Sequence, residues 1–119
     1  MNAEKTENQA LDANSSLIAV VIPAYNAANS IETVLSKIPP RVGLIVVVDD
    51  ASPDDLQAVV SKTSDNRVHL ITHTKNQGVG GAMLTGYAYA LEQGADIVVK
   101  VDSDDQMDLE YFDDLIAPL

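Results

Sequence analysis

The sequence predicts an α/β fold built on a parallel sheet with helices on both faces. Short apolar runs rich in β-branched residues alternate with helical segments of about ten to fifteen residues, which is the pattern of βαβ units. These runs are apolar at successive positions and not only at alternate ones, as expected of strands covered on both faces. Right-handed crossovers should join the successive parallel strands.

The chain should begin with a polar leader and continue as one ordered unit. Residues 1–16 offer almost no apolar surface, so we expect this leader to be disordered. It contains no basic stretch running into an apolar core, and therefore no recognisable signal peptide. The ordered domain should span residues 17–119.

The first strand is predicted over residues 17–22, with Pro23 ending it. A helix should follow, with Asn29 as N-cap and Glu32 completing a capping box. Pro39 and the next proline should stop this helix. The apolar face of the helix would consist of Ile31, Val34, Leu35 and Ile38.

The same unit then repeats. A second strand is predicted over residues 44–48, and it runs into Asp49 and Asp50. Ser52, with Pro53 behind it, predicts the start of the next helix, because proline suits the first helical position. The apolar face of that helix would be Leu56, Val59 and Val60, and a third, weaker strand should occupy residues 68–72.

A glycine-rich turn over residues 76–81 predicts a third helix, which Gly94 should close. The large apolar residues of that helix are Met83, Leu84, Tyr87 and Leu91. A fourth strand is predicted over residues 96–101, and Asp108 should cap a last helix before Pro118. With no further strands after that helix, we expect a fold truncated soon after the acidic loop that follows the fourth strand.

Charge and composition exclude several classes of function. The formal net charge is −11 and the isoelectric point is about 4.2, which argues against a nucleic-acid or anionic-membrane surface. There is no cysteine, so disulfides and thiolate metal sites are excluded. His69 and His73 lack any ligand spacing, and we expect packing or surface roles for them. No apolar stretch is long enough to span a bilayer, which predicts a soluble, cytoplasmic chain.

The acidic loop is the strongest candidate for chemistry. Asp102 and Asp104 lie two residues apart, directly after an apolar strand. Hard cations such as Mg²⁺ prefer carboxylate oxygens and often share them with a substrate phosphate. Seven of the 18 acidic residues follow Val101, and this concentration would repel a phosphate unless a cation lay between them. The alternative is a solvated loop that caps the next helix.

Polar residues follow every predicted strand, and strand ends are where open α/β sheets bind ligands. Tyr25 could stack on a base, and Asp50 could accept a hydrogen bond from the ring N–H of uracil or guanine. Lys75, beside the glycine-rich turn, is a candidate phosphate contact, because helix N-termini favour anions. Each residue also has an ordinary structural explanation. Tyr25 could be an exposed ring in a turn, and Asp50 could compete with Ser52 for the helix N-cap. The glycine-rich turn could serve close packing of a helix on the sheet, and Lys75 could be a solvated lysine.

Four motifs together resemble the nucleotide-binding half of a family 2 glycosyltransferase with the Rossmann-like GT-A fold. They are residues 20–26 (VVIPAYN), residues 47–52 (VVDDAS), Asn76-Gln77-Gly78 with Gly86, and Asp102-Ser103-Asp104. The resemblance covers residues 17–119 and implies a nucleotide-diphospho-sugar, a UDP- or GDP-sugar, as donor. The residues that it assigns to the donor are Pro23, Tyr25, Asn26, Asp50, Lys75, Asn76, Gly78, Asp102 and Ser103.

The resemblance also implies a metal and a reaction. Asp102, Asp104 and Gln106 would hold Mg²⁺ or Mn²⁺. Their D-x-D-x-Q pattern is similar to that of polyprenyl-phosphate sugar synthases, which implies a lipid-phosphate acceptor, inversion at the sugar carbon, and a parent enzyme at the cytoplasmic face of a membrane. The catalytic base is expected beyond residue 119. Val79 departs from the family, where a basic residue is common.

Two other functions stay open from the sequence. The first is a non-catalytic nucleotide-binding fragment. The second is a receiver-type signalling domain, in which Asp49 and Asp50 would imitate the acidic pair. A receiver needs an acceptor aspartate after its third strand, whereas His73, Thr74 and Lys75 occupy that position here.

Overall fold

The computed structural model describes residues 16–104, so nearly all of the predicted leader, the last helix and Gln106 lie outside the described residues. Within residues 16–104 the elements follow one another as β1 (Ile18–Ala24), α2 (Ile31–Ser36), β2 (Leu44–Asp49), α3 (Leu56–Ser61), β3 (Val68–Thr72), α4 (Gly78–Glu92) and β4 (Ile97–Lys100). This alternation of strands and helices is the predicted one.

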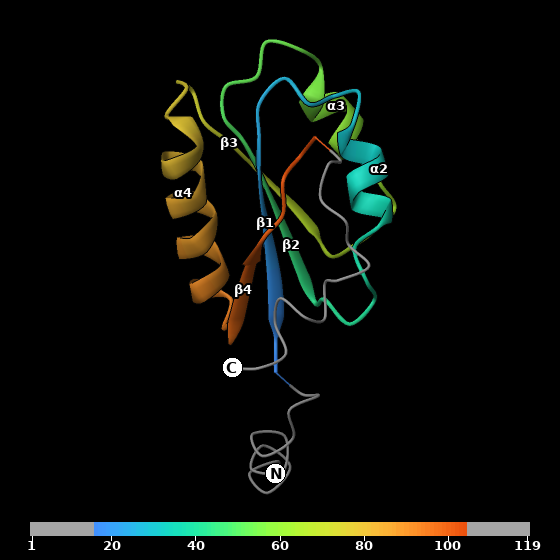
Figure 1. Ribbon diagram of the computed structural model, residues 1–119, viewed down its shortest axis with the longest axis vertical. Coiled ribbons are helices and arrows are strands. Elements are labelled where there is room, and N and C mark those ends of the chain that lie inside the picture. The colour runs from blue at the N-terminus through green and yellow to red at the C-terminus, as the bar shows by residue number, and fades with distance from the viewer. Residues whose placement is uncertain (1–15, 105–119) are drawn as a thin grey trace, which may run out of the picture.

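The four strands form one parallel sheet in the order β3-β2-β1-β4. The chain steps from β1 to β2 to β3 in one direction, and α4 then carries it back so that β4 pairs on the other side of β1. Because crossovers are right-handed, reversing the direction places the connecting helix on the opposite face. Figure 1 accordingly shows α2 and α3 on one side of the sheet and α4 on the other, which confirms the predicted architecture.

Each face of the sheet has its own core. Alternate strand residues, such as Val20, Ile22 and Val47, pack with the buried side chains of α2 and α3. The intervening residues, such as Val21 and Val48, pack under α4. Two buried faces explain why the strands are apolar at successive positions.

The prediction that Pro23 ends the first strand is wrong. β1 runs to Ala24, and Pro23 is paired with Val48 of β2. The carbonyl of Val21 accepts from Val101 on the β4 side, whereas the carbonyl of Ala24 accepts from Asp50 on the β2 side. Because the backbone groups of successive strand residues point to alternate neighbours, the N–H that Pro23 lacks would point to the β4 side. Pro23 lies beyond the last residue pair between β1 and β4, so no ladder hydrogen bond is lost.

Two predicted helix starts are also wrong. α2 has Ser30 at its N-cap position, with no side-chain capping bond, so the capping box of Asn29 and Glu32 does not form. The Ser30 hydroxyl instead donates to the carbonyl of Ser103, 2.6 Å away. α3 begins at Leu56 and not at Ser52, because residues 52–54 are bound into a turn with the neighbouring loops.

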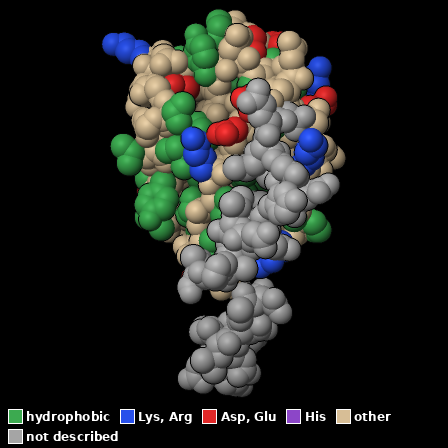
Figure 2. Space-filling model, in the orientation of Figure 1, with side chains coloured by type: hydrophobic (Ala, Val, Ile, Leu, Met, Phe, Trp, Pro, Cys, Tyr) green, Lys and Arg blue, Asp and Glu red, His purple; other side chains and the backbone are tan. Residues whose placement is uncertain are grey.

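The residues of α4 that are fully buried against the sheet are small ones, while Met83 and Tyr89 pack at the edge of this core and are only partly buried. Ala82, Gly86 and Ala90 are its buried positions, because they let the helix backbone approach the strands closely. Leu84, Tyr87 and Leu91 are exposed, although large apolar residues at helical spacing usually face the core. Hydrophobic side chains are visible over this part of the molecule in Figure 2. None of the helices within the described residues has the length and apolarity needed to cross a membrane.

Candidate functional site

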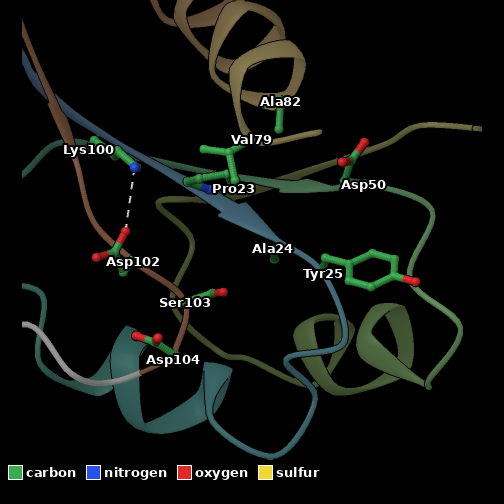
Figure 3. A pocket seen from close by; sticks show the side chains of 10 residues that line it. All are labelled: Pro23, Ala24, Tyr25, Asp50, Val79, Ala82, Lys100, Asp102, Ser103 and Asp104. Atoms are coloured by element: carbon green, nitrogen blue, oxygen red, sulfur yellow. Dashed lines mark ion pairs between the residues drawn. The ribbon is translucent and has the colours of Figure 1, made fainter. Parts of the chain in front are cut away.

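A cavity lies in the crevice at the carboxyl ends of β1 and β4. The winding direction reverses between these two strands, and such a switch point leaves an opening where neighbouring loops diverge. The cavity has a volume of about 220 Å³. Its lining comes from the end of β1 (Pro23, Ala24, Tyr25), the end of β2 (Asp50), the start of α4 (Val79, Ala82) and the end of β4 (Lys100, Asp102, Ser103, Asp104) (Figure 3).

The cavity gathers six of the residues that the sequence assigned to the donor or the metal, namely Pro23, Tyr25, Asp50, Asp102, Ser103 and Asp104. Four others, Asn26, Lys75, Asn76 and Gly78, are not among its lining residues. Lys75 in particular is exposed outside the cavity. Ala24, Val79, Ala82 and Lys100 line the cavity without having been predicted. The sequence could have predicted Lys100, because residues two apart in a strand face the same side and Asp102 follows Lys100 by two residues.

Asp50 is a buried carboxylate that joins three elements. Its Oδ1 accepts from His73 Nδ1 and from the N–H of Gln77, each at 2.8 Å, and its Oδ2 accepts from the N–H of Gly78 at 2.8 Å. A carboxylate offers about four lone-pair directions. One direction on Oδ2 is therefore left for a ligand that donates a hydrogen bond.

The charge state of Asp50 follows from these partners. Burial alone would raise its pKa, but the hydrogen bonds from His73, Gln77 and Gly78 together lower the pKa below its ordinary value of 3.8. Because the ionised carboxylate only accepts, His73 Nδ1 must donate, and in the neutral ring Nε2 then accepts from the Thr85 hydroxyl 2.8 Å away. The structure thus presents Asp50 to the cavity as an acceptor. His73 is buried, so of the packing and surface roles expected for the histidines it has the packing role.

The amide of Asn76 and the backbone of Gly78 complete this corner. Asn76 Nδ2 donates to the Asp50 carbonyl at 3.2 Å, and Asn76 Oδ1 accepts from the N–H of Gly78 at 3.1 Å. Gly78 has a φ of +81°, a conformation that glycine adopts at little cost. Asn76 and Gly78 therefore shape the loop that holds Asp50, from outside the cavity wall.

A second carboxylate, Asp54, ties together the loops after β1 and β2. It accepts from the Ser52 hydroxyl, from the N–H of Ala28 at 2.9 Å and from the N–H of Leu56 at 3.2 Å. Burial would raise the pKa of Asp54, but these hydrogen bonds lower it. The Ser52 hydroxyl also accepts from the N–H of Asn26 at 2.8 Å, which fixes the backbone next to Tyr25.

Two non-glycine residues in these loops have positive φ values, namely Asn26 at 56° and Ala51 at 61°. Such conformations are unfavourable for residues with a Cβ atom, most of all for those other than asparagine and aspartate. The hydrogen bonds of Ser52 and Asp54 on either side hold the backbone in place. The two bends let β1 and β2 deliver Tyr25 and Asp50 to the cavity in spite of this cost.

The acidic loop after β4 makes polar contacts at its start and with the beginning of α2. Lys100 Nζ lies 3.6 Å from Asp102 Oδ1, and both side chains are about half exposed (46% and 51%). Further along, the Ser103 carbonyl accepts from Ser30 at the start of α2. Asp102 and Asp104 are thereby held beside the cavity that Tyr25 and Asp50 also line (Figure 3).

The donor set fits a hard divalent cation that is shared with a phosphate. No group of three or more His, Cys, Asp or Glu residues able to hold a metal occurs within residues 16–104. Two carboxylates alone are too few for Mg²⁺ or Mn²⁺, but such ions are commonly held by one or two carboxylates with substrate phosphates and water completing the shell. Asp102 and Asp104 meet that description.

Sequence comparison decides the family. The profile described as "Glycosyl transferase family 2" matches residues 19–119. The chain belongs to glycosyl transferase family 2. The match covers the seven elements within the described residues, apart from the first residue of β1, and the acidic loop. The resemblance that the four motifs suggested is therefore confirmed, and the receiver-type alternative is wrong.

Individual relatives agree with this assignment. An undecaprenyl-phosphate mannosyltransferase from Micrococcus luteus is 35% identical over 91 residues, which is 73% of this chain and 37% of that protein. A UDP-N-acetylglucosamine–dolichyl-phosphate N-acetylglucosaminyltransferase from Methanococcus voltae is 33% identical over 118 residues, covering 87% of this chain and 47% of the relative.

A solved structure matches as well. It is glucosyl-3-phosphoglycerate synthase from Mycobacterium tuberculosis in complex with Mn²⁺, UDP and glucosyl-3-phosphoglycerate, at 26% identity and a TM-score of 0.58. The match covers 74% of this chain and 33% of that one. The chain therefore spans less than half the length of the relatives it matches.

Proposed function

We propose that this chain binds the nucleotide-diphospho-sugar donor of a metal-dependent glycosyltransferase. The observation that carries the proposal is one cavity at the switch point of the sheet, where an aromatic ring, a buried acceptor and a pair of exposed carboxylates come together. The relatives named for nucleotide-sugar and polyprenyl-phosphate chemistry support the same assignment.

Each group has a distinct task in this proposal. The Tyr25 ring, 53% exposed, stacks on the base, and the free direction of Asp50 accepts from a ring N–H. A base with such a donor, uracil or guanine, satisfies Asp50, whereas the unprotonated ring nitrogen of cytosine or adenine would leave two acceptors facing each other. Asp102 and Asp104, with Gln106, would hold Mg²⁺ or Mn²⁺. The bound cation would supply Lewis-acid stabilisation of the leaving diphosphate.

The reaction breaks the bond between the anomeric carbon of the sugar and the diphosphate oxygen, and it forms a bond to an acceptor oxygen. A polyprenyl phosphate is the proposed acceptor, because relatives named for undecaprenyl and dolichyl phosphates match most of this chain. Attack from the face opposite the leaving group inverts the anomeric carbon. In this proposal the enzyme works at the cytoplasmic face of a membrane.

Isothermal titration of the 119-residue chain with UDP, GDP and their sugars, with and without Mn²⁺, tests the donor site. Metal-dependent binding of one nucleotide is the expected result. Asp104→Ala should abolish the metal-dependent part, whereas Glu92→Ala, an exposed carboxylate at the far end of α4, should bind as the wild type does. Unchanged affinity of Asp104→Ala in Mn²⁺ would contradict the assignment.

Binding without transfer is the second candidate, favoured because the chain spans less than half of its relatives. A transfer assay with radiolabelled sugar and undecaprenyl phosphate distinguishes the two. Labelled lipid would establish transfer, whereas donor binding with no labelled lipid would indicate a binding unit that needs further residues.

A further inference from the structure

Lys100 is the one basic residue among the described residues that line the cavity, which it shares with three carboxylates. It is the last residue of β4, and Asp102 follows two positions later, so the pleat of the chain turns both side chains to the same side. Figure 3 shows the Lys100 ammonium directed at the Asp102 carboxylate, with Nζ 3.6 Å from Oδ1.

This ion pair is of a kind that exchanges easily. A distance of 3.6 Å is longer than the roughly 2.8 Å of a charge-assisted hydrogen bond. Both side chains are about half exposed, and exposed ion pairs contribute little stability. The ammonium sits on a flexible four-carbon chain that reaches several positions around its anchor. Lys100 is therefore available to another anion in the same cavity.

The cavity needs such a cation if it is to hold a diphosphate. Asp50, Asp102 and Asp104 contribute three negative charges, and the ammonium of Lys100 contributes one positive charge. A divalent ion bound to Asp102 and Asp104 would offset the charge of these two carboxylates. The negative charge of the diphosphate would remain uncompensated. Lys75, the phosphate contact expected from the sequence, is exposed and does not line the cavity.

We propose that Lys100 exchanges partners during donor binding. It pairs with Asp102 when the cavity is empty, and it moves to the diphosphate of the donor when a divalent cation takes the carboxylates. The inference rests on the proposed function and adds a residue to it. Lys100 thereby has two opposite effects, since its ammonium competes with the cation for Asp102 and attracts the diphosphate that follows.

The substitution Lys100→Met separates these effects, because methionine keeps a flexible chain and removes the charge. Mn²⁺ alone should bind Lys100→Met about two- to fivefold more tightly, since an exposed ion-pair partner no longer competes. UDP or GDP, whichever the wild type binds, should bind about tenfold more weakly in saturating Mn²⁺, since a hydrogen bond to a charged group is lost. Uridine or guanosine should bind equally well to both proteins.

The experiment uses the 119-residue chain as wild type, Lys100→Met, Lys100→Arg and the control Lys75→Met. Electron paramagnetic resonance of free Mn²⁺ measures the metal affinity, calorimetry measures nucleotide affinity, and circular dichroism with a melting curve verifies the fold. Lys100→Arg keeps the charge and should retain most of the nucleotide affinity. Lys75→Met should behave as the wild type does in both titrations.

Tighter Mn²⁺ binding together with weaker nucleotide binding in Lys100→Met supports the exchange. Wild-type nucleotide affinity in Lys100→Met, or a loss confined to Lys75→Met, overturns the assignment of Lys100 and leaves the proposed function intact. A wild type that binds neither UDP nor GDP in Mn²⁺ overturns the proposed function, and the assignment of Lys100 with it. Should Lys100→Met fail to fold, Lys100→Gln is titrated in its place.

Discussion

Gly86 lies close against β1 and β2, and replacing it with alanine is a sharp test of the packing of α4. A Cβ atom at this position would overlap Cγ1 of Val21 and lie 3.1 Å from Cγ2 of Val48. Both valines are fully buried strand residues, and β-branched side chains have few alternative rotamers. The helix must therefore move away from β1 and β2 to admit the methyl group.

The expected cost follows from two opposing terms. Overpacking a well-filled core costs about 1–3 kcal/mol of stability. Because the new methyl group would overlap Val21, we expect the overpacking cost of Gly86→Ala to be about 3 kcal/mol. Alanine in place of glycine within a helix returns about 1 kcal/mol. The net loss of about 2 kcal/mol corresponds to a melting temperature lower by about 8 °C for a chain of this size.

Gly80→Ala is the matched control, because it makes the same change in the same helix. A Cβ atom at Gly80 meets nothing within 4 Å, and Gly80 is exposed. Only the helix-propensity term acts there, so this variant should be more stable than the wild type by about 0.5–1 kcal/mol. Melting curves followed by circular dichroism measure both variants. A Gly86→Ala protein as stable as the wild type would refute the close packing of α4 on β1.

Three further predictions concern the loops and the site. The depressed pKa values of Asp50 and Asp54 stabilise the folded state above the ordinary carboxyl value of 3.8, and this stability is lost as the pH falls through the lower folded-state values. Urea midpoints should therefore drop from pH 5 towards pH 3, and the drop should be shallower in Asp54→Asn; parallel curves would contradict this. Ala51→Gly should raise stability by about 0.5–1 kcal/mol, because glycine relieves the cost of a φ of 61°; a lower melting temperature would be the opposing result. Tyr25→Ala should weaken binding of UDP or GDP by about 1–3 kcal/mol, the usual contribution of base–aromatic stacking, whereas Tyr25→Phe should keep most of the affinity, and calorimetry that finds the two variants equal would exclude stacking.

Local sequence signals identified the strands and misplaced the helix starts, for a physical reason. The runs at residues 17–22 and 44–48 contain only apolar residues, and no competing interaction with side-chain polar groups arises there. Ser30 and Ser52, in contrast, have hydroxyl groups that can bond to any nearby acceptor or donor. Their partners, the carbonyl of Ser103 and the carboxylate of Asp54, come close only after the sheet has assembled.

The face of α4 shows the same limit. Large apolar residues at helical spacing usually face the core, and Leu84, Tyr87 and Leu91 fit that pattern. The fully buried positions are instead Ala82, Gly86 and Ala90, and at Gly86 the valines of β1 and β2 leave no room for a larger side chain. Periodicity alone does not distinguish a contact made by large residues from one made by small ones.

The site was predictable to the extent that it depends on strand ends. Parallel strands must deliver their carboxyl ends to one edge, so Tyr25, Asp50 and Asp102 could be grouped from the sequence alone. The spacing of Asp102 and Asp104 also indicated cation chemistry without any knowledge of the fold.

Tertiary structure alone decided which residues reach the cavity and in what state. The strand order β3-β2-β1-β4 places the opening between β1 and β4, which brings Lys100 in and leaves Lys75 outside. The same packing buries Asp50 against His73 and the start of α4. The sequence determined the alternation of elements and the chemistry available at their ends, because both are local. The pairing of those ends is a property of the assembled sheet, since it depends on which strands become neighbours.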